Sequence, residues 1–197
     1  MRLILARHGE TDQNVKHIIQ GQTNTSLNQR GLEQARKLGH WLKDEDIHHI
    51  YASDLKRAAD TARAIQVHHP HLEIVFTPQL RERHFGELEG KSFEYVKQLQ
   101  KKLHATNLIT TVGEPLQDMC TRAEHFFQSL FPKHMDDTVL VIAHGLFNRG
   151  VIAAIEGKSF QEIETIERLH NTSVCIYQFD KRRKVNVVCF NSVEHLG

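Results

Sequence analysis

Residues 3–9, with the sequence LILARHG, decide the fold, because an apolar run changes abruptly there to charge and glycine. Four consecutive apolar residues indicate a buried strand, and the polar residues after them indicate the loop that follows it. In open α/β sheets, ligands bind at this end of the strands. Arg7 beside His8 suits a phosphate, because a guanidinium matches phosphate oxygens and a neutral imidazole is nucleophilic. Gly9 would let the backbone approach a bound anion closely.

A second strand repeats this pattern later in the chain. Residues 138–143 (TVLVIA) form the strongest apolar run in the sequence, and His144 and Gly145 follow it directly. Such a run is typical of a strand that is buried on both faces. If the two strands are neighbours in one sheet, His8 and His144 meet at the same edge. The two patterns therefore predict an α/β fold with a site at that edge.

The elements between these strands are predicted from periodicity and turn residues. Residues 49–52 and 72–76 are expected to be strands, and residues 174–179 and 185–190 to form a hairpin. Helices are expected at about 28–43, 54–65, 92–103, 116–130 and 146–155. Asn28 is the expected cap of the first helix, and Ser53 and Asp54 are the expected cap of the second. The first helix is predicted to bury one face, which carries Leu32, Ala35, Leu38, Gly39 and Leu42.

Several polar residues follow predicted strands and are therefore candidates for the site. The polar segment 12–26 reads as a loop over the strand end, where Asn14 offers an amide. Residues 20–23 offer backbone donors or make a turn, and the sequence does not decide between these. Arg57 falls in the first turn of a helix, where acidic residues are preferred, which suggests an anion clamp. Glu82 lies between two arginines, where a glutamate is usually a surface ion-pair residue. Residues 105–114 read as an irregular cover over the site.

Composition excludes several classes of function. The chain has 197 residues, which fits one domain over residues 1–197. Lys and Arg number 25 and Asp and Glu 24, so no net field favours nucleic acid or an anionic membrane. The basic cluster at 181–184 reads as the tip of the hairpin. The sequence has no apolar stretch long enough to span a membrane and no signal peptide, so a cytoplasmic protein is expected.

Cysteine and histidine usage give no clear metal site. Cys120, Cys175 and Cys189 lack metal-ligand spacing, and reduced thiols are expected, although Cys175 and Cys189 lie on facing strands of the predicted hairpin. The 15 histidines include the clusters 48–49 and 68–71. The cluster 68–71 surrounds a proline and has no carboxylate or cysteine at ligand spacing. Both clusters are interpreted as incidental surface histidines rather than metal ligands.

Four motifs taken together resemble the histidine phosphatase superfamily, which contains cofactor-dependent phosphoglycerate mutases and related phosphatases. They span nearly the whole chain in the family's order and rough spacing. They are RHGET at 7–11 with Asn14, SDLKRA at 53–58, LRE at 80–82 with Gly86, Glu89 and Gly90, and AHG at 143–145. The combination is far more specific than the first motif alone.

This resemblance implies a three-layer α/β/α sandwich around a mostly parallel mixed sheet. It also implies that His8 is phosphorylated in catalysis and that Glu82 donates the proton to the leaving group. Arg7, Arg57 and His144 would bind the transferred phosphoryl group, with Asn14 assisting. The arginines would supply the charge that the transfer needs, so no metal or other cofactor is expected. Substrate contacts are also expected from Gln20, Gly21, Gly145 and Leu146.

Departures from the family pattern bear on the substrate, and the balance of features favours a phosphatase over a mutase. Leu88 stands where many family phosphatases have Trp, and residues 82–86 resemble the corresponding stretch of the mutases, with Phe85 where they have Tyr. The chain lacks room for the mutases' substrate-binding insertion, and Leu146 and Phe147 would add apolar surface beside the pocket. The prediction is a phosphomonoesterase that hydrolyses a small phosphorylated metabolite through a phosphohistidine. The alternatives are a cofactor-dependent phosphoglycerate mutase and a non-catalytic phospholigand-binding module. The protein is expected to be a monomer or homodimer that binds neither nucleic acid nor membrane.

Overall fold

A six-stranded mixed sheet forms the centre of the computed structural model, which describes residues 1–102 and 111–197. The strand order is β3-β2-β4-β1-β5-β6. The first four strands in this order run parallel, β5 is antiparallel to β1, and β6 is antiparallel to β5. The strands are β1 (Arg2–Arg7), β2 (His49–Ser53), β3 (Ile74–Thr77), β4 (Thr138–Ala143), β5 (Val174–Phe179) and β6 (Val185–Ser192). The prediction of an α/β fold around a mostly parallel mixed sheet is confirmed.

Strands β1 and β4 are direct neighbours. Arg7 is in register with Ala143, so His8 and His144 leave the sheet side by side. All six residues of β4 are buried, as its uninterrupted apolar run predicts. The two strands therefore bring two histidines to the carboxyl edge of the sheet.

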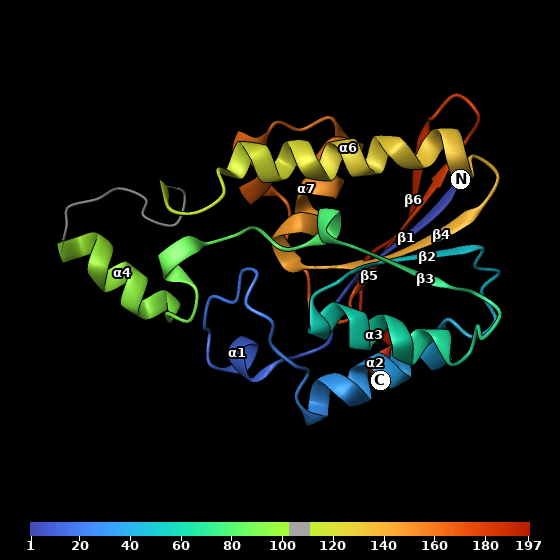
Figure 1. Cartoon of the computed structure of the whole chain (residues 1–197). Coiled ribbons are helices and arrows are strands. Elements are labelled where there is room, and N and C mark those ends of the chain that lie inside the picture. The colour runs from blue at the N-terminus through green and yellow to red at the C-terminus, as the bar shows by residue number, and fades with distance from the viewer. Residues whose placement is uncertain (103–110) are drawn as a thin grey trace.

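Helices cover both faces of the sheet (Figure 1). Helices α2 (Gln29–Trp41) and α3 (Lys56–Gln66) pack on one face, and α6 (Leu116–His134) and α7 (Gly145–Glu156) pack on the other. Alternate residues of β1 point to the two faces: Ile4 joins the core beneath α2 and α3, whereas Leu5 joins the core beneath α6 and α7. The sandwich holds the carboxyl edge of the sheet between two helical layers.

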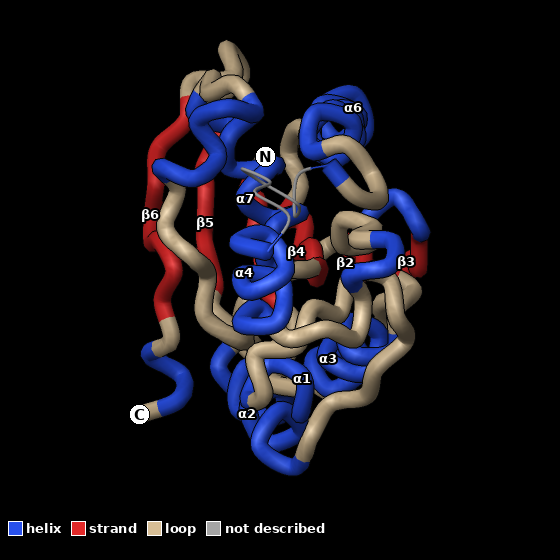
Figure 2. Tube along the Cα trace, turned by 90° about the vertical axis from the view of Figure 1, so that its left-hand side faces the viewer, coloured by secondary structure: helices blue, strands red, loops and turns tan. Residues whose placement is uncertain are grey.

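Shorter elements surround the carboxyl edge. Helices α1 (Asp12–Val15) and α4 (Phe93–Lys102) lie on the left of Figure 1 and toward the viewer in Figure 2. A bridge between Ile18 and Ser92 joins the segments that carry these two helices. The 3₁₀ helices are η1 (Pro78–Leu80), η2 (Gly86–Leu88), η3 (Phe160–Thr165) and η4 (Glu194–Leu196).

Several local predictions differ from the structure. The predicted loop 12–26 contains the one-turn helix α1, because Thr11 and Asn14 form a reciprocal capping box around its start. Leu32, predicted to lie on the buried face of α2, is 45 % exposed, so that prediction is wrong. Helix α6 continues past Leu130 to His134 and contains Pro132. The predicted cover 105–114 lies mostly outside the described residues.

The predicted cap of α3 is also wrong. The N-cap is Leu55, which has no side-chain capping bond. The Ser53 hydroxyl instead accepts a bond from Leu55 N–H and contacts His144, and the Asp54 carboxylate binds Arg81 through both oxygens. Both side chains are thus used to position site residues rather than to cap the helix.

Candidate active site

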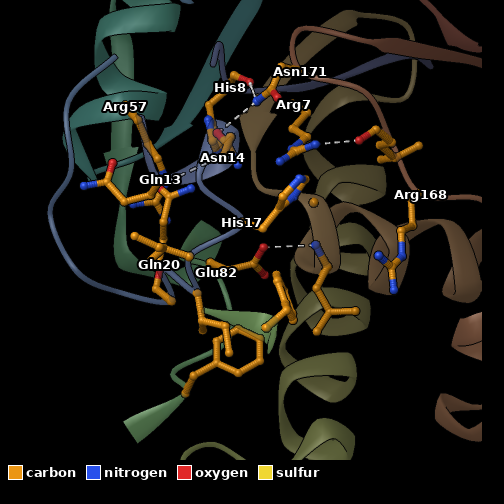
Figure 3. Close-up of a pocket in the computed structure, with 18 of the residues that line it drawn as sticks. Arg7, His8, Gln13, Asn14, His17, Gln20, Arg57, Glu82, Arg168 and Asn171 are labelled. Carbon is orange, nitrogen blue, oxygen red and sulfur yellow. Dashed lines mark hydrogen bonds between the residues drawn. The ribbon is translucent and has the colours of Figure 1, made fainter. Parts of the chain in front are cut away.

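A cavity of about 420 Å³ opens at the carboxyl edge of the sheet (Figure 3). Most of the predicted site residues line it together. These are Arg7, His8, Asn14, Gln20, Gly21, Arg57, Glu82, Gly145 and Leu146. His144 does not line the cavity, but its ring centroid lies 5.1 Å from that of His8 and its side chain is fully buried. The cavity thus collects residues from all four motifs.

His8 is held in a defined tautomer. Its Nδ1 lies 2.7 Å from the carbonyl oxygen of Gly9, and a carbonyl can only accept, so Nδ1 carries a proton. Burial lowers the pKa of His8 well below its ordinary value, and the charges of Arg57 and Arg7 lower it further. The ring is therefore neutral, and its Nε2 carries the lone pair. A neutral imidazole nitrogen of this kind is a competent nucleophile near neutral pH.

Arg57 lies beside that nitrogen. Its Nε donates to His8 Nε2 over 3.3 Å, and its two terminal nitrogens donate to the carbonyl oxygens of Thr23 and Gly21. Only 1 % of Arg57 is exposed. Burial lowers its pKa to about 10, which still leaves the guanidinium charged near neutral pH. The prediction that Arg57 stands at the start of α3, next to a strand end, is confirmed.

Arg7 brings a second guanidinium to the cavity. Its Nη1 donates to the carbonyl oxygen of Leu169 over 2.6 Å, whereas its Nε is buried and has no partner in the described part of the chain. A Cβ at Gly145 would lie 3.4 Å from this Nε, so a larger residue there would cover it. Burial lowers the pKa of Arg7, and the charge of Glu82 opposes this shift. The unpartnered Nε is a donor available to an anion.

His144 is positioned by Ser53 of β2. Its Nε2 lies 2.8 Å from the Ser53 hydroxyl, and its buried Nδ1 has no partner among the described residues. Burial lowers the pKa of His144 well below its ordinary value, with Arg57 and His8 adding to the shift. An unsatisfied buried nitrogen costs free energy unless a ligand pairs with it. His144 and Arg7 each have one such unsatisfied buried nitrogen.

Glu82 caps helix α7. One oxygen accepts from the backbone N–H groups of Phe147 and Arg83, and the other accepts from that of Leu146, each at 2.9–3.0 Å. The side chain points into the cavity (Figure 3). Its neighbour Arg81 pairs with Asp54 over 2.6 Å. The carboxylate is thus fixed by a helix N-terminus and directed toward the cavity.

Asn14 and Asn171 close one side of the cavity. The Asn14 oxygen accepts from Thr11 and from Asn171 Nδ2, so its own amide N–H groups remain for a ligand. Asn171 Nδ2 also donates to the carbonyl oxygen of His8 over 3.1 Å. Figure 3 shows both side chains near His8. Asn14 is placed as the sequence predicted, in reach of a group bound to His8.

The 20–23 segment forms a turn, one of the two alternatives considered for it, because Thr23 N–H donates to the Gln20 carbonyl oxygen over 2.9 Å. The turn also supplies acceptors for Arg57, from Gly21 and Thr23. Gly21 has φ of +51°, and a Cβ there would clash with the Glu89 carboxylate. That carboxylate accepts from Gln22, Thr23 and Phe85. Burial opposes the ionisation of Glu89, but these hydrogen bonds lower its pKa overall. Gln20 accepts from the hydroxyls of Thr11 and Thr25.

Two predictions about the surroundings are wrong. Gly9 does not line the cavity; a Cβ there would lie 2.6 Å from the backbone oxygen of Gly31, so the close approach is to helix α2 and not to an anion. Phe147 adds no surface to the cavity, because it points into the core and is fully buried. Leu146 does line the cavity.

Some residues of the site carry no local signal in the sequence. Asn171, His17 and Arg168 line the cavity from segments that read as loops. Thr61 of α3 accepts from Gly9 N–H and donates to the Arg57 carbonyl, so it joins β1 to Arg57. The sequence predicts Ser53 as a helix cap and as part of a family motif, but not as the partner of His144. Their roles depend on contacts between segments that are remote along the chain.

Comparison with known proteins agrees with this geometry. Residues 3–192 match the model of the histidine phosphatase superfamily, branch 1. The chain belongs to this family. The resemblance found in the sequence is confirmed, and it places the chain among enzymes of the phosphatase class.

Relatives and solved structures of this family cover the whole chain. The chain is 31 % identical over 202 residues to phosphoglycerate mutase-like protein 4 of Arabidopsis thaliana, covering 98 % of this chain and 86 % of that protein. It is 31 % identical over 205 residues to a broad-specificity phosphatase of Saccharomyces cerevisiae, covering 100 % and 88 %. The solved structure of YhfR from Bacillus stearothermophilus is similar with a TM-score of 0.89 at 28 % identity, covering 100 % and 99 %.

No helix among residues 1–102 and 111–197 combines the length and hydrophobicity that a membrane span requires.

Proposed function

We propose that this protein is a phosphomonoesterase that hydrolyses a small phosphorylated metabolite through a phosphohistidine on His8. The observation that carries the proposal is the neutral His8, whose Nε2 lone pair faces a cavity bordered by two guanidiniums. The unpartnered Nε of Arg7 and Nδ1 of His144 support an anionic ligand at the same place. Cations and hydrogen-bond donors around a nucleophile are what phosphoryl transfer requires.

In the first step, His8 Nε2 attacks phosphorus and the bond from phosphorus to the ester oxygen breaks. Arg57 and Arg7 stabilise the charge on the equatorial oxygens as it develops. Ser53 holds His144 by Nε2, and in the tautomer in which the Ser53 hydroxyl donates to Nε2, the proton of His144 stands on Nδ1 for a phosphoryl oxygen. The Asn14 amide supplies a further donor.

Glu82 is proposed as the acid that protonates the departing ester oxygen. An alkoxide is a very poor leaving group unless it takes up a proton as the bond breaks. Three backbone N–H groups fix the Glu82 carboxyl group at the cavity.

In the second step, water replaces the leaving group. Glu82, now a carboxylate, takes a proton from a water molecule while the water oxygen attacks phosphorus. The phosphorus–nitrogen bond breaks and its electron pair returns to His8 Nε2. The products are the alcohol and inorganic phosphate, and the enzyme is restored. The arginines supply the positive charge throughout, so we expect thorough chelation to leave the rate unchanged.

The far wall of the cavity is of mixed character. Ile19, Phe85 and Leu146 give it apolar surface, whereas His17 and Arg168 give it polar groups. A cavity of this size fits a small metabolite. A compact phosphate ester with both apolar and polar parts is therefore the expected substrate class.

Two measurements test the proposal. Phosphate release is compared across sugar phosphates, nucleotides, phosphoglycerates and phosphopeptides, and the reaction with a labelled substrate is quenched during turnover. We expect a label on His8 that survives base and is lost in acid. A label on serine or aspartate, or full activity in His8→Ala, would overturn the proposal.

The alternatives have distinct results in the same assays. Interconversion of phosphoglycerates primed by 2,3-bisphosphoglycerate, without net phosphate release, would identify a mutase. Saturable binding of phosphate esters without turnover of any of them would identify a binding module.

A further inference from the structure

A second pair of histidines lies at the opposite edge of the sheet. His49 begins β2, Asp137 immediately precedes the neighbouring strand β4, and His134 ends α6. Figure 1 shows this end of α6 beside the N-terminus, on the other side of the molecule from α1 and α4. The proposed catalytic mechanism uses none of these three residues.

The three side chains converge on one point. His49 Nε2 and His134 Nδ1 each lie 3.1 Å from the same Asp137 oxygen, Oδ2. One ligand atom from each residue lies within 4.8 Å of the other two. Ligands of a tetrahedral zinc ion, bound at about 2.0–2.2 Å, stand roughly 3.3–3.5 Å apart. A small outward movement therefore makes room for an ion between the three atoms.

The surroundings of His134 suit a metal ligand. Its Nε2 lies 2.9 Å from the Tyr51 hydroxyl. With an ion on Nδ1, the proton of the neutral ring stands on Nε2 and is donated to the Tyr51 oxygen, an outer hydrogen bond of the kind that orients metal-bound histidines. The His134 side chain is 7 % exposed, whereas those of His49 and Asp137 are 43 % and 29 % exposed. One ligand is thus rigidly held, and the other two leave a path for an ion and for a water as fourth ligand.

The charge around this pair is opposite to that around the catalytic pair. The Asp137 carboxylate is in contact with both rings through its Oδ2 atom. A carboxylate between two imidazoles is a cation site, whereas two guanidiniums beside two imidazoles form an anion site. Imidazole donors favour zinc and its neighbours in the first transition row over magnesium or calcium.

The geometry points to a binding site for a divalent transition-metal ion, such as zinc, formed by His49, His134 and Asp137. The ion would join the end of α6 to the starts of β2 and β4 and so stabilise the fold without entering the phosphatase reaction. The expectation that cluster 48–49 is incidental considered only neighbours along the chain, whereas the other two ligands are remote in sequence.

The test titrates the chelator-treated full chain with Zn²⁺ against a chromophoric zinc indicator, and with Co²⁺ while recording its visible spectrum. Thermal unfolding is measured with and without Zn²⁺. We expect one tight equivalent, tetrahedral cobalt bands and a higher Tm with zinc. His49→Ala and Asp137→Ala should lose all three. His125→Ala, an exposed histidine on the same helix α6, should retain them.

Phosphatase activity and circular dichroism show whether each variant is folded, and His49→Ala is the more conservative of the two because its side chain is half-exposed. Zinc binding that persists in both His49→Ala and Asp137→Ala would overturn the site. So would loss of the tight equivalent in His8→Ala with retention in His49→Ala, or an absence of binding at micromolar zinc. None of these results depends on whether the protein hydrolyses phosphate esters.

Discussion

Strand β2 carries two hydroxyls that each hold a histidine by Nε2, with opposite consequences at the two edges of the sheet. Ser53 holds His144 over 2.8 Å, and Tyr51 holds His134 over 2.9 Å. His144 packs against His8 among arginines, whereas His134 packs against His49 beside Asp137. The same residue type, held by the same kind of bond, is thus prepared for an anion at one edge and for a cation at the other.

The two histidine pairs differ in the charge around them. This charge, and not the histidines themselves, determines whether a pair binds an anion or a cation. At the carboxyl edge the nearest carboxylate, Glu82, is bound to backbone N–H groups of α7 instead of to a histidine. At the amino edge Asp137 contacts both rings directly. If surrounding charge decides what each pair binds, substitutions at the two edges should have different effects.

The largest effect on the reaction rate is expected for Glu82, whose carboxylate is bound to backbone N–H groups and not to a histidine. Glu82→Gln removes the proton donor, and loss of a general acid costs about 10²–10⁴-fold. We expect this loss in the first step for alkyl phosphates, whereas p-nitrophenyl phosphate should lose far less because its leaving group is stable as an anion. Burst or single-turnover kinetics measure that step separately from hydrolysis.

Comparing the two substrates also controls for structural damage. The glutamine amide cannot accept all three backbone N–H bonds, and the resulting disorder of α7 would slow both substrates alike. An equal factor for both would mean that Glu82 is not the acid. Glu10 and Glu89 would then be the next candidates for the general acid, although Glu10 lies outside the cavity lining and is bound by Asn28.

The next effect tests the positive charge that distinguishes the carboxyl edge. Arg57→Ala should slow phosphoryl transfer on the order of a hundredfold or more, as when other preorganised charge-stabilising donors are removed. Arg63→Ala is the matched control, because Arg63 lies on the same helix α3 but is exposed and paired with Asp60. Transfer rates from single-turnover kinetics check this. A loss below about threefold in folded Arg57→Ala would return Arg57 to a structural role.

The sequence was sufficient for the carboxyl edge because its signals are local. Uninterrupted apolar runs mark β1 and β4, and the strand ends place the histidines that follow them, His144 directly after its run and His8 after Arg7. Arg57 and Glu82 lie a few residues beyond the ends of β2 and β3. The burial of Leu32 and Phe147 was judged wrongly from sequence, because packing against particular neighbours decides it.

The remainder depends on contacts between distant segments. Asn171 reaches His8 from a loop, and the metal-ligand set combines the start of β2 with the end of α6. No spacing along the chain shows either. The acceptors of Arg57 are backbone carbonyls in the 20–23 segment, and the residue types there did not decide between a turn and a binding loop.

A smaller effect concerns the neutrality of the catalytic histidines. Unfolded histidine takes up a proton below about pH 6.5, whereas burial and the nearby arginines lower the pKa of folded His8 and His144 well below that value. The unfolded state then binds more protons, so stability falls as the pH decreases below about 6.5. The decrease is at most about 1.4 kcal/mol per pH unit for each histidine. Urea unfolding at several pH values should show a shallower slope in His8→Asn than in the parent protein. Equal slopes would show that His8 is protonated in the fold.

The smallest effect comes from the two hydroxyls of β2 and tests whether the two edges are independent. Ser53→Ala leaves His144 Nε2 without its partner beside the reacting phosphoryl group, and the loss of one such bond, about 1.4 kcal/mol, corresponds to about tenfold in kcat. Tyr51→Phe removes the equivalent bond to His134 and should reduce the free energy of unfolding by about 0.5–1.5 kcal/mol. Its kcat and KM should stay within about twofold of the parent values, because Tyr51 is not among the residues that line the cavity. Steady-state kinetics and urea unfolding of both variants measure these effects. Equal loss of kcat in Ser53→Ala and Tyr51→Phe would mean that β2 transmits the state of one histidine pair to the other, and the two edges would then have to be treated as one coupled site.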